Sequence, residues 1–316
     1  MLRYIAQRLA ESAVVLLIMS FVIYGLIGLM PGDPIDIMVS ADPNLTPADA
    51  ERLRALYGLD RPIHERYLTW LGAALQGDFG YSRLHARPVL EILWPRLGTT
   101  VILMGASFAL ALLLALPAGL WAALKPRSLS DAAVNLVAFA GISIPQFWLA
   151  ILLIIVFAVF LGWLPAGGMA PSGAGLGTQI AHLALPVAAL TIATLGGLLR
   201  FVRAATMEAL RQDYVRTARA KGLSEARVVL GHVLRNAMIP VVTILALNFG
   251  TLFSGALITE IMFGTLGMGK TIYDAILGND FNLALIGLLL ATLTTLLANL
   301  LADLCYAWLD PRISYQ

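Results

Sequence analysis

The chain has 316 residues, of which 59% are hydrophobic and only 13% are charged, and its mean hydropathy is +0.83. Water-soluble domains have about 25% charged residues, so this composition excludes an ordinary soluble protein. The net charge of +2 offers no basic surface for nucleic acid, and the single cysteine, Cys305, excludes a disulfide framework or a cysteine-rich metal site. The composition predicts a protein embedded in a membrane, and its continuous apolar runs without alternation predict an all-α fold.

Five stretches without charged residues are long enough to cross a bilayer, because about 20 helical residues span its hydrocarbon core. The third stretch is long enough to cross twice and is interrupted by glycine and proline between Trp163 and Gly177. The sequence therefore predicts six transmembrane helices, near 12–30, 98–124, 132–162, 180–202, 237–259 and 281–302.

The distribution of Lys and Arg predicts how these helices are oriented. The N-terminal stretch is too long for a signal peptide and has no small-residue cleavage site, so we interpret it as a retained first helix. With the N-terminus inside, the cytoplasmic segments carry most of the Lys and Arg residues. Both termini are therefore expected in the cytoplasm, with a first helix at 1–30, an outer loop region at 31–97 and a core of five helices at 98–316.

The outer loop region is predicted to fold. It contains nine acidic and seven basic residues. Its helix signals are Thr46 at an N-cap, Pro47 at the first helical position and Gly58 after the last turn. A second, amphipathic helix is predicted from the spacing of Ile63, Tyr67, Leu68, Leu71 and Leu75.

The loop at 203–236 is the main cytoplasmic segment. From Arg200 to Asn236 the chain carries eight basic and three acidic residues, yet its apolar residues keep helical spacing. Two short helices interrupted at Gly222 are predicted, and Ser224 followed by Glu225 supplies the second start signal. A cationic helical segment of this kind is suited to docking a soluble partner protein.

One segment, from Gly264 to Thr271, fits the phosphate-loop pattern G-x-x-x-x-G-K-[ST]. In a nucleotide site this loop follows a buried strand and opens a helix, so that its amides bind phosphate. Here it follows a predicted membrane helix, on the side expected to be outside. We therefore interpret it as a glycine-rich turn. The alternative, a membrane-embedded ATPase, requires this turn to face the cytoplasm.

The remaining polar residues offer few candidates for a functional site. The segment from Gly141 to Gln146 places a proline inside the third span, which either bends the helix or lines a polar passage. The candidates for passage lining are Ser143, Pro145, Gln146 and Asn248. Asp303 lies near the cytoplasmic end of the last span, where a structural or snorkelling role is favoured. The four histidines have no partners at metal-ligand spacing, so no metal site is expected.

The cytoplasmic loop resembles that of ABC importer permeases. Tyr214–Leu223 and His232–Pro240 are similar to the loop of the dipeptide, oligopeptide and nickel family of binding-protein-dependent permeases. The resemblance covers nearly the whole chain, and the order and spacing of its motifs are more specific than any one of them. The other motifs are Pro31–Pro34, Tyr57–Asp60 with Pro62, Gly77–Ser82, Gly141–Trp148, Trp163–Gly168 and Leu309–Arg312.

This resemblance implies that the loop couples ATP hydrolysis in partner subunits to transport. The residues expected to do so are Tyr214, Arg216, Ala218, Arg219, Lys221, Gly222, Leu223, Glu225 and Arg235. Compared with the broader permease pattern, Ala218, Gly222 and Leu234 agree. Three positions depart from it, namely Arg216, His232 and Arg235.

The resemblance further implies a type I ABC importer permease, a MetI-like bundle, in the bacterial inner membrane. Its partners would be a second homologous permease, two ATP-binding subunits, an extracytoplasmic substrate-binding protein and membrane lipid. The chain itself is expected to be no enzyme and to bind no cofactor, because ATP and Mg²⁺ belong to the partner subunits. Di- and oligopeptides are the implied cargo, with nickel chelates or glutathione as the alternative. A non-transporting membrane scaffold or receptor subunit is the remaining alternative class.

Overall fold

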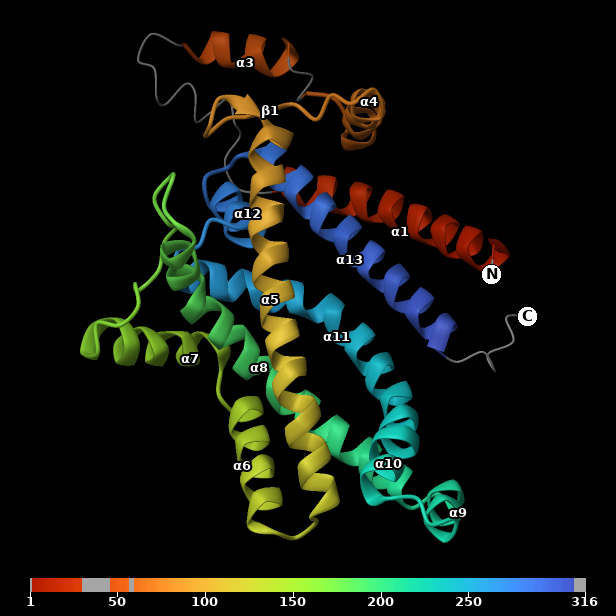
Figure 1. The fold of residues 1–316 in the computed structure, drawn as a ribbon. Helices are drawn as coiled ribbons and strands as arrows, with labels where there is room; N and C mark the ends of the chain where they lie inside the picture. Colours follow the sequence, from red (N-terminus) through yellow and green to blue (C-terminus); the bar gives the residue numbers. More distant parts are fainter. Residues whose placement is uncertain (1, 30–45, 57–59, 310–316) are drawn as a thin grey trace. The chain divides into compact units, whose positions relative to one another are not determined.

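A computed structural model describes residues 2–29, 46–56 and 60–309. The expected all-α fold is observed with one addition, a short hairpin of two strands (Figure 1). The elements are α1 (Leu2–Gly28), α3 (Pro47–Leu56), α4 (Ile63–Leu75), β1 (Tyr81–Ser82), β2 (Arg87–Pro88), α5 (Val89–Leu124), α6 (Leu129–Ser143), α7 (Gln146–Leu153), the π-helical η1 (Ile154–Phe160), α8 (Leu176–Leu210), α9 (Asp213–Ala220), α10 (Glu225–Val228), the π-helical η2 (Val229–Val233), α11 (Leu234–Phe263), α12 (Met268–Leu277) and α13 (Phe281–Leu309). The predicted features at Pro31–Pro34, Gly58 and Arg312 lie outside the described residues.

The chain divides into two compact units. Unit 1 comprises Gly98–Lys270 with Thr295–Gln316, and unit 2 comprises Leu2–Leu97 with Thr271–Thr294. The helices α5, α12 and α13 continue from one unit into the other. Unit 1 therefore holds both the loop at 203–236 and the glycine-rich turn from Gly264 to Lys270 that the sequence singles out.

In unit 1, helix α8 packs along both α6 and α11. Its contact with α6 is close because glycines face backbone: a Cβ added at Gly196 would lie 2.5 Å from the Ala138 carbonyl oxygen, and one at Gly141 would lie 2.9 Å from that of Ile192. Small residues let helices approach in this way where lipid supplies no hydrophobic driving force. The buried core is rich in alanine for the same reason: Ala111, Ala115, Ala138, Leu198, Leu199, Val202, Ala205, Ala209, Val215, Ala218, Val228, Val233, Ala237 and Val241.

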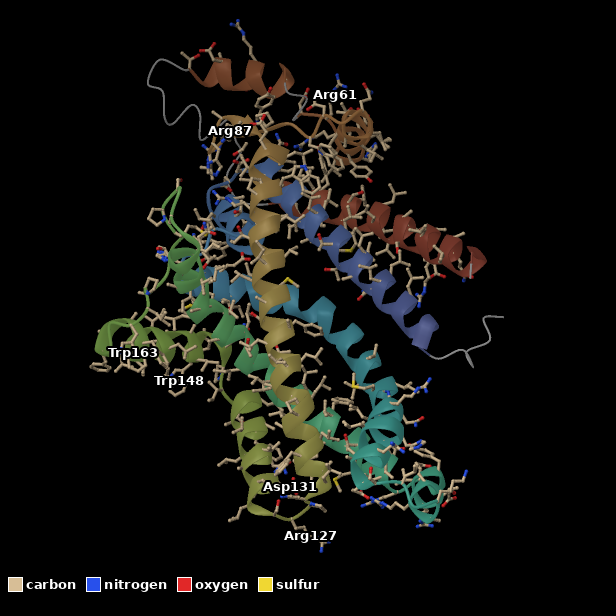
Figure 2. All side chains as sticks on the ribbon, viewed as in Figure 1. Arg61, Arg87, Arg127, Asp131, Trp148 and Trp163 are labelled. Carbon is tan, nitrogen blue, oxygen red and sulfur yellow. The ribbon has the colours of Figure 1, made fainter. Side chains whose placement is uncertain are left out.

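The third predicted span is broken between α6 and α7. The two halves are bent by 105° (Figure 1). Pro145 explains the break, because the residue before a proline is pushed out of the helical region, and Ile144 has ψ 121°. Of the two interpretations of this proline segment, the bend is observed. Beyond the bend, Trp148 lies on α7 and Trp163 follows η1, both exposed (Figure 2).

In unit 2, helix α4 packs against α1 through aromatic side chains. The hydroxyl groups of Tyr67 and Ser20 are 2.7 Å apart and both residues are buried. The rings that gather around this contact are those of Phe21, Tyr24, Tyr67, Trp70 and Phe281. The amphipathic helix predicted from Ile63 onward is thus confirmed, and it buries Tyr67 against α1.

Two further contacts order unit 2. The Thr46 hydroxyl accepts the amide of Asp49 at 3.3 Å, which confirms the predicted N-cap of α3. The strand hairpin is fixed to the turn before α13, because the buried carboxylate of Asp280 accepts the Ser82 hydroxyl at 2.5 Å and the Leu84 amide at 3.0 Å. Within its described residues, the region at 31–97, expected to fold, therefore contains α3, α4 and the strand hairpin.

Among the described residues, four helices are long and apolar enough to cross a membrane, and the bent pair of α6 and α7 with η1 raises this number to five. The four are Ile5–Gly28, Val89–Leu124, Leu176–Leu210 and Phe281–Leu301. The fifth predicted span, 237–259, falls within α11. Several helices extend beyond the predicted spans. For example, α5 begins at Val89, α8 runs to Leu210 and α13 runs to Leu309, because these helices continue past the charged residues that end the apolar runs.

Candidate coupling surface

Two short helices, α9 and α10, follow α8 in the chain and precede α11, and they lie at the ends of these long helices (Figure 1). α9 begins at Asp213 and α10 begins at Glu225, and an acidic residue suits the positive end of the helix dipole. The predicted pair of helices interrupted at Gly222 is thus confirmed. The Ser224 side chain makes no capping hydrogen bond, so the start of α10 depends on the backbone, where the Val228 amide donates to the Ser224 carbonyl at 3.0 Å.

Gly222 ends α9 in a left-handed conformation, with φ +77°. Its amide donates to the carbonyl of Arg219 at 2.9 Å, and the Leu223 amide donates to that of Ala218 at 3.4 Å. These two bonds form a Schellman motif, which satisfies the last carbonyls of a helix and favours glycine at the left-handed position. A residue with a Cβ is strained there, so the angle between α9 and α10 depends on this glycine.

The inner faces of α9 and α10 belong to the buried core of unit 1. Val215 and Ala218 of α9 and Val228 of α10 are buried in one cluster with Val202 and Ala209 of α8. Leu223, in the turn, packs against the same cluster. The two helices are therefore packed into the same buried cluster as α8, with η2 in contact with all three helices.

The outer faces of α9 and α10 are charged and mainly basic. The exposed charges here and at the adjoining helix ends are Arg211, Asp213, Arg216, Arg219, Lys221, Glu225, Arg227 and Arg235. Across the turn, Arg219 contacts both carboxylate oxygens of Glu225, at 2.5 Å and 3.1 Å. The hydrogen bond and charge of Arg219 hold the pKa of the Glu225 carboxyl below its ordinary value. We call this basic outer face, residues 211–235, the coupling surface.

The nine residues that the resemblance assigns to coupling lie in the core beneath the surface, in the turn, or on the exposed face. Ala218 is buried, Leu223 is half-buried, and Gly222 forms the turn. Tyr214 is 37% exposed on α9, and its partial burial raises the pKa of its hydroxyl. The charged members lie on the exposed side of α9, the turn and α10, except one in the first turn of α11: Arg216, Arg219, Lys221, Glu225 and Arg235.

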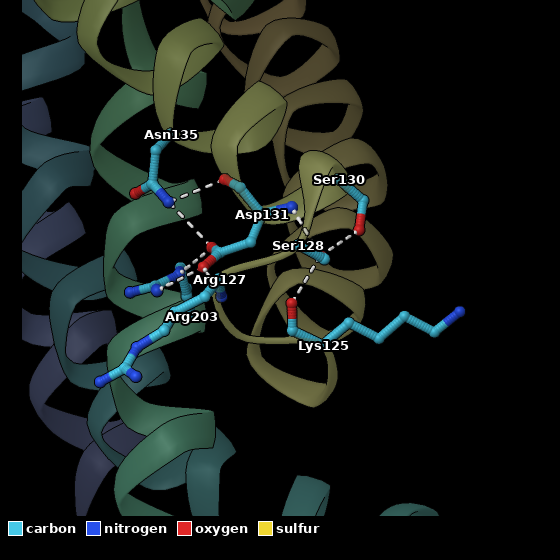
Figure 3. Close-up of polar contacts among 7 residues, drawn as sticks. All are labelled: Lys125, Arg127, Ser128, Ser130, Asp131, Asn135 and Arg203. Atoms are coloured by element: carbon cyan, nitrogen blue, oxygen red, sulfur yellow. Dashed lines mark hydrogen bonds and ion pairs between the residues drawn. The ribbon is translucent and has the colours of Figure 1, made fainter.

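Sequence reasoning missed the ion pair that ties α8 to α6 (Figure 3). Arg203 donates from Nε and Nη2 to the two carboxylate oxygens of Asp131, at 2.6 Å and 2.9 Å. Asp131 is buried and also accepts the Asn135 side-chain amide at 2.8 Å and the Arg127 backbone amide at 2.9 Å. This pair connects the helix that carries the coupling surface to the helix that leads into the bend.

The same carboxylate organises the turn between α5 and α6 (Figures 2 and 3). Arg127 has φ +62°, a conformation that costs energy in a residue with a Cβ. Ser128 caps α6 by accepting the Asp131 amide at 3.2 Å. The only signal for this network in the sequence is a pair of charged residues at the edges of apolar runs, 72 positions apart.

Of the four candidates for passage lining, Gln146 makes a contact between helices. Its side-chain amide donates to the hydroxyl of Thr259 on α11 at 3.0 Å. Ser143 and Pro145 are exposed beside the bend. Asn248 lies in α11, and its side chain is outside the described residues. Asp303 is half-buried in α13.

The segment resembling a phosphate loop follows a helix, α11, and no strand. It turns at Gly264, with φ +63°, and then opens α12. The amide of Lys270 donates to the carboxylate of Glu260 at 2.9 Å, so an acid of the chain itself occupies the amides that would face a phosphate. Within residues 2–29, 46–56 and 60–309, no group of three His, Cys, Asp or Glu residues could hold a metal ion.

The fold is also found in a solved ABC transporter structure. The chain superimposes on one chain of a structure described as inward facing conformations of the MetNI methionine ABC transporter, with a TM-score of 0.57 and 18% identity. The match covers 71% of this chain and 98% of that one. At this identity the likeness establishes the fold alone.

The sequence comparisons establish the family. Residues 115–315 match the model of the binding-protein-dependent transport system inner membrane component, and residues 1–104 match the model of its N-terminal region. The chain therefore belongs to this family of inner-membrane permeases, and its work is transport across the membrane.

Curated relatives match over the full length of both chains. The oligopeptide transport system permease protein AppB of Bacillus subtilis is 38% identical, as is the di/tripeptide transport system permease protein DppB of Pseudomonas aeruginosa. The glutathione transport system permease protein GsiC of Escherichia coli is 37% identical. In each comparison, all of this chain and all of the relative are covered.

Proposed function

We propose that this chain forms half of the passage of an ATP-driven importer for di- and oligopeptides. Six spans cross the inner membrane, with both termini and the coupling surface in the cytoplasm. A second homologous permease completes the passage, two ATP-binding subunits dock beneath it, and an extracytoplasmic binding protein delivers the peptide. The chain is no enzyme and binds no cofactor, since ATP and Mg²⁺ are used by the docked subunits.

The coupling surface is the observation that carries this proposal. It combines an exposed basic face with an inner face buried in the same cluster as α8, so a soluble partner with acidic groups can bind the first while the second moves the long helices. Closure of the ATP-binding subunits would shift α9 and α10, and α8 and α6 would follow as packed bodies through the pair of Asp131 and Arg203.

Gly222→Val tests this role. Valine at φ +77° is strained by about 1–2 kcal/mol, which alters the angle between α9 and α10 without touching the spans. We expect normal membrane insertion, continued ATP hydrolysis and loss of uptake of labelled dipeptide in the reconstituted complex. Gly231→Ala is the matched control, because an added Cβ there meets no atom within 4 Å. Normal uptake by Gly222→Val would refute the assignment.

The substrate class is tested in the same vesicles. Unlabelled dipeptide, oligopeptide, glutathione and nickel chelate are each added in excess to the wild-type complex with its binding protein. Competition by peptides is the expected result. The 37% identical relative named for glutathione makes that tripeptide the second candidate, and competition by glutathione alone would replace peptides in the proposal.

A further inference from the structure

The last turn of α11 is a junction at which several elements of unit 1 meet. The hydroxyl of Thr259 accepts Gln146 of α7 at 3.0 Å, and the carbonyl of Phe263 accepts the amide of Gly168 at 2.7 Å. Phe263 itself is buried among side chains of α7 and α8. Glu260 lies between these contacts and is fully buried.

Glu260 is held by donors from two other helices. The hydroxyl of Thr100 on α5 donates to its Oε1 at 2.5 Å, and the amide of Lys270 donates to its Oε2 at 2.9 Å. The amide of Gly269 also bonds to the carboxyl group. Thr100 in turn accepts the amide of Met268 at 2.8 Å. Glu260 and Thr100 thus accept three consecutive backbone amides.

These three amides are the first of α12, which have no partner within their own helix. Most helices satisfy such amides with the side chain of the N-cap residue. The residue at that place here is Gly267, which has no side chain. The carboxylate of Glu260 therefore caps α12 from another helix, where its charge also suits the positive helix end.

Two glycines of this segment follow from the same contact, namely Gly267 and Gly269, and the second of them belongs to the phosphate-loop pattern. A Cβ at Gly267 would collide with the carboxyl group of Glu260, and one at Gly269 would lie 2.7 Å from the Cα of Leu257 and 3.1 Å from Glu260 Oε2. Glycine at both positions lets the backbone pass beside the carboxylate. Gly269 of the pattern is thus explained by an acid that the chain supplies itself.

We infer that Glu260 is a positioning residue of the transport cycle, which holds the first turn of α12 to α5 and to the last turn of α11. This inference rests on the proposed function, since it assigns Glu260 to the same permease. With the carboxylate removed, the α11–α12 turn loses its fixed place, while the coupling surface, on α9, α10 and the opposite end of α11, is unchanged.

Hydrogen exchange of the assembled complex in lipid nanodiscs tests the contact directly. In Glu260→Ala we expect the amides of Gly269 and Lys270 to exchange about tenfold faster or more, the ratio for losing a hydrogen bond to a charged acceptor. Sodium formate, compared with sodium chloride at equal ionic strength, should restore protection by refilling the carboxylate position. Unchanged exchange in Glu260→Ala, or no response to formate, would overturn the inference.

A matched pair of variants at Thr100 tests the same contact if Glu260→Ala fails to insert into the membrane. Thr100→Ser retains the hydroxyl and should behave as the wild type. Thr100→Val keeps the shape but neither donates to Glu260 nor accepts from Met268, so Met268 should exchange faster. Equal exchange in the two variants would contradict the proposed contact.

Transport separates positioning from mere folding. We expect Glu260→Ala to insert, to bind ATP with its partners as the wild type does, and to take up peptide at least tenfold more slowly, with formate restoring uptake. Glu260→Gln should be intermediate, because its amide nitrogen cannot accept a backbone amide. Wild-type uptake by Glu260→Ala would overturn the inference, whereas a wild-type complex that transports no peptide would refute the proposed function and leave the exchange test standing.

Lys270→Ala addresses the nucleotide alternative. The contact described here uses the backbone amide of Lys270, so ATP binding by the complex should be unchanged in this variant. A lost ATP signal would overturn the inference and favour a nucleotide site at the turn.

Discussion

At the scale of single residues, the carboxylate of Asp131 accepts hydrogen bonds from three other residues. It pairs with Arg203 at two points, accepts the amide of a strained Arg127 and receives Asn135. Removing such a carboxylate leaves a guanidinium and a backbone amide without their acceptor. The resulting loss of stability is larger than the net stability that the ion pair adds to the folded protein. The consequences of a substitution are therefore largest at the acid.

Asp131→Ala should lower the free energy of unfolding of unit 1 by about 1–3 kcal/mol. This is less than the cost of breaking a fully buried ion pair, because water can still reach the partly exposed Arg203. Thermal unfolding in detergent, followed for both single variants and for the double variant with Arg203→Ala, measures it. The effects should be far from additive, since both variants break one network. Additive effects would show that the pair does not act as a unit.

The pair of Arg219 and Glu225 gives a dependence on pH. Because the pKa of Glu225 is lowered in the folded protein, its contribution is present above the ordinary carboxyl pKa and is lost as pH falls through the lowered value. Amides over 219–228 should be better protected in the wild type than in Glu225→Gln at pH 7. The difference should begin to shrink as the pH falls to about 4, near the reference value for Glu, and should vanish once the pH is below the lowered pKa of the folded protein. A difference that persists in acid would assign the protection to another contact.

At the scale of elements, α8 is the helix on which the others are assembled. It carries α9 at its end, pairs with α6 through Arg203, and lies along α11. Glycines set its distance from α6, because added methyl groups at Gly141 or Gly196 would meet backbone oxygen atoms. Backbone cannot move aside as a flexible side chain can, so this contact is rigid.

Two adjacent glycines of α8 test that statement. Gly196→Ala should destabilise the protein by about 1–3 kcal/mol, because the methyl group would lie 2.5 Å from the Ala138 carbonyl oxygen and force α6 away. Gly197→Ala is the control: its methyl group meets nothing within 4 Å, so the better helix propensity should leave it neutral or stabilised by up to about 1 kcal/mol. Thermal unfolding in detergent measures both. Equal melting temperatures would show that the two helices are not in close contact there.

At the scale of the whole molecule, the proposal depends on which side of the membrane each segment faces. Ser224 belongs to the coupling surface and Gln76 to the end of α4, and both are exposed. In the proposed topology the first is cytoplasmic and the second is outside, since the Lys and Arg excess of residues 200–236 favours the inner side.

Labelling of single cysteines in intact cells tests this topology. In a Cys305→Ser background, a maleimide that cannot cross the membrane should react with Gln76→Cys from outside and with Ser224→Cys only after the cells are opened. Labelling of Ser224→Cys in intact cells would place the coupling surface on the wrong side for ATP-binding subunits. That result would end the proposal for the whole molecule.

The sequence by itself determined the features that depend on neighbours along the chain. Apolar runs without charge predict spans, Thr46 predicts the start of α3, and Gly222 predicts the break after α9, because capping and left-handed turns involve only a few consecutive residues. The family resemblance was likewise visible in short motifs whose order covers nearly the whole chain.

Only the tertiary structure decided which distant polar groups meet. Asp131 and Arg203 are 72 positions apart, and Thr100 and Glu260 are 160 apart, so no local pattern joins either pair. The acceptor for the amides of the segment from Gly264 to Thr271 was hidden for the same reason: the sequence predicts a glycine-rich turn there, but only the fold shows that Glu260 accepts its amides. A buried polar group needs a partner, and the packing of the helices determines which one it finds.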